Sequence, residues 1–115
     1  MGKLTTHVLD AARGRPGAGI AIKLFSLAGG RHLVASTQTN SDGRTERPLL
    51  DEETFRPGNY ELEFLVADYF ADAGLPVDDP PFLGEVIVRF SLADGQNYHV
   101  PLLVTPWSYS TYRGS

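Results

Sequence analysis

The chain has 115 residues, no cysteine and a formal net charge of −4 at pH 7 with histidine neutral. This length suits one domain with its own core, and a hydrophobic share of 42% argues against disorder. The mildly acidic balance provides no basic face for nucleic acid or an anionic membrane, and the lack of cysteine excludes disulfides, thiolate zinc sites and a cysteine nucleophile.

We expect neither a signal peptide nor a peroxisomal signal at the ends of this sequence. The opening residues MGKLTTHVLD lack the apolar stretch of a signal peptide, and the closing RGS is not a peroxisomal signal. No apolar run approaches the roughly 20 residues that span a bilayer. We therefore expect a soluble, cytoplasmic, single-domain protein over residues 1–115, with neither a nucleic acid nor a membrane as partner.

Short strands separated by turn sequences follow one another, which favours an all-β sandwich or barrel. In chain order the expected strands are 3–10, 19–27, 32–39, 60–66, 85–92 and 97–104, followed by a C-terminal edge strand in SYSTY at 108–112. Clean alternation of apolar and polar residues supports 60–66 and 85–92 most strongly. Pro101 lacks an amide hydrogen, so the strand at 97–104 is expected at a sheet edge or with a bulge.

One segment breaks the strand pattern. Residues 67–73 do not alternate, and Gly74 and then Pro76 follow them, which indicates a single short helix. The proline-rich residues 75–82 are expected to form an extended loop. The total is seven or eight strands and one helix.

Apolar residues also occur on the expected outer faces of the strands. Leu65, Ile87 and Leu103 lie opposite the core residues of their strands. Several such residues on neighbouring strands form the kind of patch that marks an interface, so we expect a homo-oligomer.

Two of the three histidines are candidates for chemistry. If residues 4, 6 and 8 face the core, His7 faces outward with Thr5, and the alternation of 97–104 turns His99 outward as well. His32 lies at a hairpin tip, where a structural role is expected. Imidazole is the group best matched to proton transfer at neutral pH, so His7 and His99 are candidate acid and base residues.

Other site types find less support. Two histidines without a third ligand make a poor zinc site, and neither a G-x-S-x-G elbow nor a Walker sequence is present. Arg44 follows the turn NSDG and is either a solvated residue or a guanidinium fork for an anionic or carbonyl-rich ligand. Tyr112 and Arg113 near the C-terminus offer a stacking or hydrogen-bonding surface for a flat heterocycle.

Four segments, in order over nearly the whole chain, resemble the 5-hydroxyisourate hydrolase family, the transthyretin-like enzymes of purine breakdown. They are LTTHVLDAARGRPGAGI, TNSDGR, FLVADYF and YHVPLLVTPWSYSTYRGS. The closing YRGS is the most specific of these motifs, because it separates the hydrolases from vertebrate transthyretins.

The resemblance implies a transthyretin-type sandwich of two four-stranded sheets with one short helix near 67–73. It implies homotetramers, dimers of dimers with active sites at the dimer–dimer interface. It implies hydrolysis of 5-hydroxyisourate to 2-oxo-4-hydroxy-4-carboxy-5-ureidoimidazoline, with no cofactor and no metal. The catalytic residues carried over are His7, Arg44 and His99, and the substrate-binding residues are His7, Arg44, Tyr112, Arg113, Gly114 and Ser115.

The division of labour between the two histidines stays open, and Arg113 or Ser115 is expected to anchor the tail itself. Two other classes of function also remain open. One is a transthyretin-like carrier of a hydrophobic small molecule, and the other is a sandwich that serves as an adhesion or interaction module. A carrier does not need the YRGS ending, His7 and His99, and an ultraviolet assay for ring opening distinguishes an enzyme from an interaction module.

Overall fold

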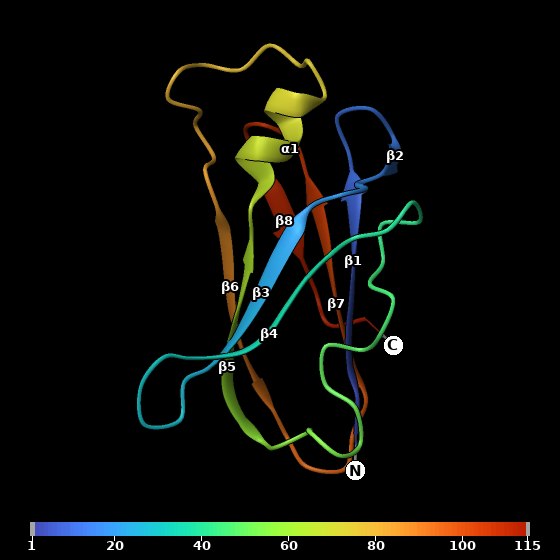
Figure 1. The fold of residues 1–115 in the computed structure, drawn as a ribbon, viewed down its shortest axis with the longest axis vertical. Coiled ribbons are helices and arrows are strands. Elements are labelled where there is room, and N and C mark those ends of the chain that lie inside the picture. The colour runs from blue at the N-terminus through green and yellow to red at the C-terminus, as the bar shows by residue number, and fades with distance from the viewer. Residues whose placement is uncertain (1, 115) are drawn as a thin grey trace.

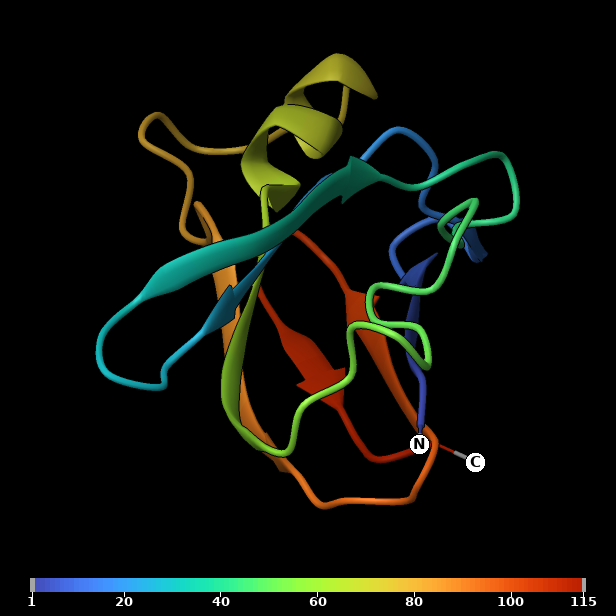
Figure 2. The ribbon, with the colours of Figure 1, turned by 60° about the horizontal axis from the view of Figure 1, so that its bottom comes forward.

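Two four-stranded sheets pack face to face in the computed structural model, which describes residues 2–114 (Figure 1, Figure 2). The strand orders are β2-β1-β7-β8 and β4-β3-β5-β6. The elements are β1 (Leu4–Asp10), β2 (Arg15–Pro16), β3 (Ala21–Ser26), β4 (His32–Gln38), β5 (Gly58–Phe64), α1 (Val66–Asp72), β6 (Val86–Leu92), β7 (Tyr98–Val104) and β8 (Tyr109–Thr111). The expected sandwich with one short helix is confirmed.

The core lies between the sheets and is built from alternate residues of the strands, as the period of two predicts. Fully buried members include Ile22 of β3, Leu62 of β5 and Leu102 of β7. Helix α1 follows β5 directly and buries Val66 and Phe70 against this core. No helix within residues 2–114 is long and apolar enough to cross a membrane.

A buried carboxylate joins the end of β1 to the helix. Asp10 accepts hydrogen bonds from the Tyr69 hydroxyl at 2.7 Å and from Nε of Arg13 at 2.9 Å. Its other oxygen accepts from the backbone amides of Ala12 and Arg13, so the carboxylate also shapes the turn after β1. Burial alone would raise the pKa of Asp10, but the bonds from Tyr69 and Arg13 outweigh it and hold the pKa below its ordinary value.

The expectation for Pro101 is wrong, because β7 is an inner strand between β1 and β8. The β7–β8 register pairs Leu102 with Thr111, and an isolated bridge pairs His99 with Gly114, which places Tyr112 opposite Pro101. The nitrogen of Pro101, which carries no hydrogen, therefore lies opposite residue 112, just beyond the end of β8 at Thr111. The inner strand β7 tolerates proline at this position because its hydrogen-bond ladder with β8 does not continue past Thr111.

The prediction that Leu65, Ile87 and Leu103 form one apolar patch is also wrong. Leu65 and Ile87 belong to the β5 and β6 side of the sandwich, whereas Leu103 belongs to β7 in the other sheet. The outer faces of two packed sheets point in opposite directions, so these side chains do not adjoin. The two-residue strand β2 was likewise not anticipated, because RGRPGAG reads as a turn.

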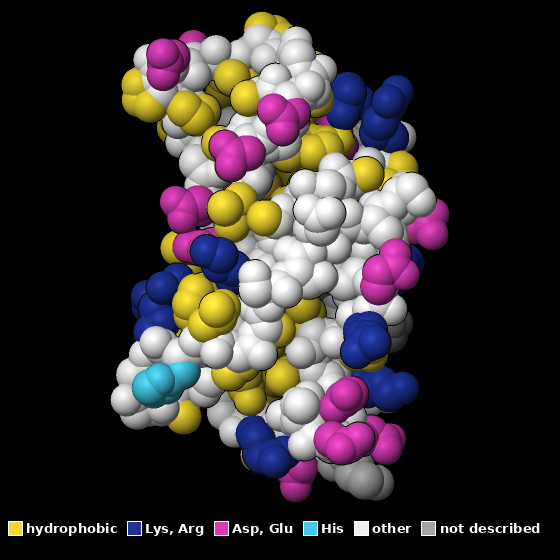
Figure 3. Space-filling view, in the orientation of Figure 1, with side chains coloured by type: hydrophobic (Ala, Val, Ile, Leu, Met, Phe, Trp, Pro, Cys, Tyr) yellow, Lys and Arg dark blue, Asp and Glu magenta, His cyan; other side chains and the backbone are white. Residues whose placement is uncertain are grey.

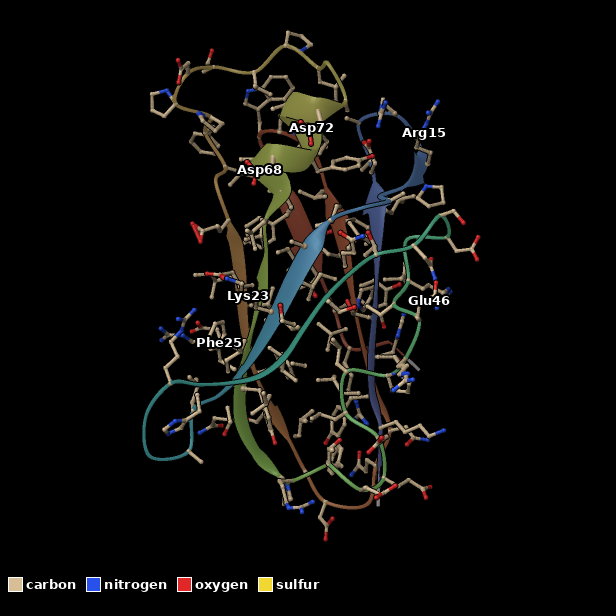
Figure 4. All side chains as sticks on the ribbon, in the orientation of Figure 1. Arg15, Lys23, Phe25, Glu46, Asp68 and Asp72 are labelled. Atoms are coloured by element: carbon tan, nitrogen blue, oxygen red, sulfur yellow. The ribbon has the colours of Figure 1, made fainter. Side chains whose placement is uncertain are left out.

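The outer face of the sheet β4-β3-β5-β6 is charged. Glu61 is 2% exposed and accepts hydrogen bonds from Arg31 at 2.8 Å and from Arg89 at 2.9 Å. Phe25, which projects from β3 with Lys23, is covered by the Arg31 guanidinium at 3.6 Å from the ring centre (Figure 4).

Acidic side chains gather around α1 at the top of Figure 3, where Asp68 and Asp72 are exposed.

Candidate functional site

The two candidate imidazoles meet on the outer face of the sheet β2-β1-β7-β8. Strands β1 and β7 pair in parallel, with Thr5 beside His99 and His7 beside Pro101. Nδ1 of His7 lies 2.6 Å from Nε2 of His99, and the rings stack with centroids 4.8 Å apart and planes 22° apart. Residues 92 positions apart in the chain thus form one hydrogen-bonded pair.

Thr5 extends this pair into a chain of three groups. Its Oγ1 lies 2.7 Å from Nδ1 of His99, so both ring nitrogens of His99 are engaged by neighbouring side chains. The sequence places Thr5 on the same outer face as His7 but does not reveal this contact. The contact depends on the register between two strands that are distant in the chain.

Arg44 reaches the pair through a tight turn. The Asn40 side chain accepts from the amides of Asp42 and Arg44, and the Gly43 amide donates to the Asn40 carbonyl. Gly43 has φ +75°, and a Cβ there would lie 2.5 Å from the Val8 carbonyl oxygen. Only glycine allows this close approach to β1, which places Arg44 beside His7 in an isolated bridge.

Burial and charge lower the pKa of both imidazoles. Desolvation is the larger cause for His7, followed by the positive charge of Arg44. For His99, desolvation again comes first, followed by the charges of His7 and Arg44. The lowered pKa of both rings favours their neutral form at neutral pH, the state in which an imidazole accepts a proton.

The C-terminal tail lies along the same surface. The Gly114 amide donates to the His99 carbonyl at 2.7 Å, and a Cβ on Gly114 would meet the His99 ring at 3.0 Å. Glycine thus lets the tail pass directly over the imidazole. Tyr112, opposite Pro101 in the register, lies on the His99 face and is 60% exposed.

Arg113 points away from the imidazoles. Its guanidinium stacks on the Tyr98 ring at 4.3 Å, and Nη2 donates to the Gln96 side chain at 2.8 Å. These contacts tie the tail to the start of β7. The predicted residue Ser115 lies outside the described residues.

The remaining histidine is elsewhere. His32 begins β4 in the other sheet and is exposed. Within residues 2–114, no three His, Asp or Glu side chains gather as a metal site requires. The structure thus brings together His7, His99, Arg44 and the tail: two neutral imidazoles, a cation and an aromatic ring on an open surface. Such a set suits proton transfer to and from a flat, polar ligand.

Comparison with known proteins places the chain among close relatives. The model of the HIUase/Transthyretin family matches residues 4–114. The 5-hydroxyisourate hydrolase of Ralstonia nicotianae is 56% identical over 117 aligned positions, which cover the whole of both chains.

Solved structures agree with this placement. A crystal structure of (S)-allantoin synthase superposes with a TM-score of 0.94 at 44% identity, covering 99% of the present chain and 44% of that one. The 5-hydroxyisourate hydrolase of Klebsiella pneumoniae gives a TM-score of 0.84 at 29% identity, with both chains covered completely.

Proposed function

The chain belongs to the HIUase/Transthyretin family, and from this premise we propose that it is an enzyme that hydrolyses 5-hydroxyisourate. The observation that carries the proposal is the 2.6 Å contact between His7 and His99 beside Arg44. A hydrophobic carrier has no need of two hydrogen-bonded, neutral imidazoles on an open face. The names of the close relatives support the same activity.

The reaction is hydrolysis of a cyclic amide. The oxygen of water bonds to a ring carbonyl carbon while the imidazole pair accepts the proton that the water releases. The C–N bond then breaks, its electron pair stays on the ring nitrogen, and that nitrogen takes a proton. The attacked carbon becomes a carboxylate, and the product is 2-oxo-4-hydroxy-4-carboxy-5-ureidoimidazoline.

We assign each side chain of the site a role that is consistent with its position. His7 and His99 form the hydrogen-bonded unit that takes up the proton of water and returns it to the leaving nitrogen. Arg44 holds carbonyl oxygens of the substrate and the negative charge that develops on the attacked carbonyl. Tyr112 offers its exposed ring to the flat heterocycle, and the Gly114 backbone forms the wall next to His99.

Arg113 and Ser115 complete the tail. Arg113 holds the tail through Tyr98 and Gln96, so its contribution to substrate binding is to keep Tyr112 and Gly114 in position. Ser115 is proposed from the family resemblance alone.

The site is proposed to be completed by a second subunit. Tyr112 is 60% exposed on an open face, and bulk water at an open face weakens the electrostatic interactions of the site with a substrate. In a homotetramer built as a dimer of dimers, with active sites at the dimer–dimer interface, this face would be covered by a neighbour.

Turnover of freshly generated 5-hydroxyisourate, followed by ultraviolet absorbance, tests the function. His7→Ala and His99→Ala are each expected to lower kcat/KM by about 100-fold or more, the usual contribution of acid–base catalysis. His32→Ala, in the other sheet, is the matched control and should keep the wild-type rate. Near-native kcat/KM in both site variants would exclude the two-imidazole mechanism.

A further inference from the structure

We propose that Thr5 is a positioning residue of this site: its hydroxyl oxygen accepts a hydrogen bond from Nδ1–H of His99, which leaves Nε2 of His7 as the nitrogen that accepts the proton from water. The catalytic meaning of this inference rests on the proposed function. Its structural content, the positions of the ring hydrogens, can be measured without substrate.

Within residues 2–114, hydrogen bonds engage three of the four ring nitrogens of the pair. His99 uses Nδ1 at 2.7 Å from Thr5 Oγ1 and Nε2 at 2.6 Å from His7 Nδ1. The fourth ring nitrogen, Nε2 of His7, takes no part in these two contacts. His99 thus acts through His7, and His7 is the ring able to present a nitrogen to the substrate.

Whether that nitrogen carries a hydrogen depends on the direction of the hydrogen bonds. A neutral imidazole has one N–H and one acceptor nitrogen, so the chain of Thr5, His99 and His7 runs in one of two directions. If the Thr5 hydroxyl donates to Nδ1 of His99, then Nε2–H of His99 donates to His7 and the hydrogen of His7 lies on Nε2. In that direction Nε2 cannot accept a proton from water.

In the opposite direction the Thr5 oxygen accepts. His7 Nδ1–H donates to His99 Nε2, His99 Nδ1–H donates to Thr5 Oγ1, and the Thr5 hydroxyl hydrogen turns elsewhere. Nε2 of His7 then carries a lone pair and is a competent base.

Two features favour this second direction. The Tyr98 carbonyl oxygen lies 3.5 Å from Thr5 Oγ1 and provides an acceptor for the hydroxyl hydrogen. Arg44 acts on His7 as a positive neighbour, and a cation favours a lone pair over an N–H at the exposed end of the chain. Each donor in the chain of His7, His99 and Thr5 then points away from Arg44, and the Thr5 hydroxyl donates to the Tyr98 carbonyl.

In this direction of the hydrogen bonds, one proton travels from water through His7 to the substrate. As water attacks, its proton moves to Nε2 of His7, which becomes an imidazolium and keeps donating from Nδ1 to His99. The same proton then passes to the leaving ring nitrogen and restores neutral His7. Thr5 contacts no reacting atom; it sets the starting tautomer.

Three variants separate this role from general packing. Thr5→Val removes the hydroxyl at nearly constant shape, and Thr5→Ser retains it. Thr6→Val is the matched control, because Thr6 is the next residue of β1 and its hydroxyl also bonds to β7, at the Val100 carbonyl on the core side. Two-bond ¹⁵N–¹H correlation spectra of ¹⁵N-histidine-labelled full-length protein report the tautomer of each ring, with His7→Gln and His32→Gln used for assignment.

Wild-type protein is expected to show both His7 and His99 with hydrogen on Nδ1. Thr5→Val should lose this pattern and lower kcat about 10- to 100-fold with little change in KM, the range typical for residues that orient a functional imidazole. Thr5→Ser should restore both readouts, and Thr6→Val should change neither tautomer.

An Nε2–H tautomer of His99 in the wild type would overturn the proposal, and this measurement does not depend on whether Thr5→Val folds. So would unchanged tautomers and kcat in folded Thr5→Val. If the wild type shows the Nδ1–H pattern, and Thr5→Val alters it, in a protein that does not hydrolyse 5-hydroxyisourate, the positioning role stands and the proposed function fails.

Discussion

Each imidazole of the pair is held in its neutral form by its surroundings. Burial lowers the pKa of His7 and His99, and Arg44 lowers both further. A base works only when unprotonated, so kcat/KM should rise as the pH rises through the pKa of the pair. Because that pKa lies below the ordinary imidazole value of about 6.5, activity should persist into mildly acidic solution.

The contribution of Arg44 to this profile can be separated from its contribution to binding. Arg44→Gln removes the positive neighbour, so the pKa of the pair should rise and the acidic limb of kcat/KM should move to higher pH. Arg44→Lys keeps the charge and should keep the limb in place even if the rate falls. The measurement is kcat/KM from pH 4.5 to 8; an unmoved limb in Arg44→Gln would contradict the electrostatic account.

At the scale of the elements, the C-terminal tail is held against β7 by specific contacts. It leaves β8 where Pro101 has no hydrogen to donate, passes over His99 at Gly114, and is held by Arg113 on Tyr98. Chain ends are poorly ordered unless they are tied down, and these contacts tie this one to β7.

Deletion of residues 112–115 tests the tail as a unit. The sandwich core does not include these residues, so the circular dichroism spectrum should remain that of the folded protein. Loss of the Tyr112 ring and of the Gly114 wall should lower kcat/KM by about 100-fold or more, as loss of substrate positioning commonly does. Full activity in the truncated protein would show that the tail has no part in the site.

The joint between β1 and α1 makes a separate prediction about stability. Asp10→Asn keeps the shape but removes the charge that receives hydrogen bonds from Tyr69 and Arg13. We expect a loss of about 2 kcal/mol in the free energy of unfolding, measured by urea denaturation. Asp72→Asn on the exposed surface of α1 is the control, and an equal effect in both would contradict a special role for Asp10 (Figure 4).

At the scale of the whole molecule, three aromatic side chains in and next to the edge strand β8 are exposed to water. Trp107, Tyr109 and Tyr112 are 55%, 46% and 60% exposed in the single chain. Exposed aromatic surface at one edge of a sandwich is typical of a protein–protein interface. We expect further copies of this chain to cover it.

Sedimentation velocity tests the assembly. We expect a tetramer of 12.6 kDa chains, and we expect specific activity to fall on dilution once the tetramer dissociates, because each site would lose its cover. A monomer with full specific activity at the concentration of the assay would contradict a site completed by a neighbour.

Much of the fold was predictable from local pattern. A period of two in apolar residues indicates strands and assigns each residue to a face, which is why the core and the outward direction of His7 and His99 follow from the sequence. The helix expected at 67–73 forms at Val66–Asp72, because glycine and proline end it locally. Pro101 shows the limit of this reasoning, since a residue's own chemistry does not reveal whether its neighbour strand has already ended.

The sequence by itself determined most of the sheet-forming segments, their buried faces and, through its motifs, the family. Only the tertiary structure decided that Thr5, His99 and His7 form one hydrogen-bonded chain and that Arg113 points away from it. The physical reason is that strand register is set by packing between segments more than 90 residues apart. A shift of one residue would turn His99 to the opposite face, and no local periodicity records which register the folded protein adopts.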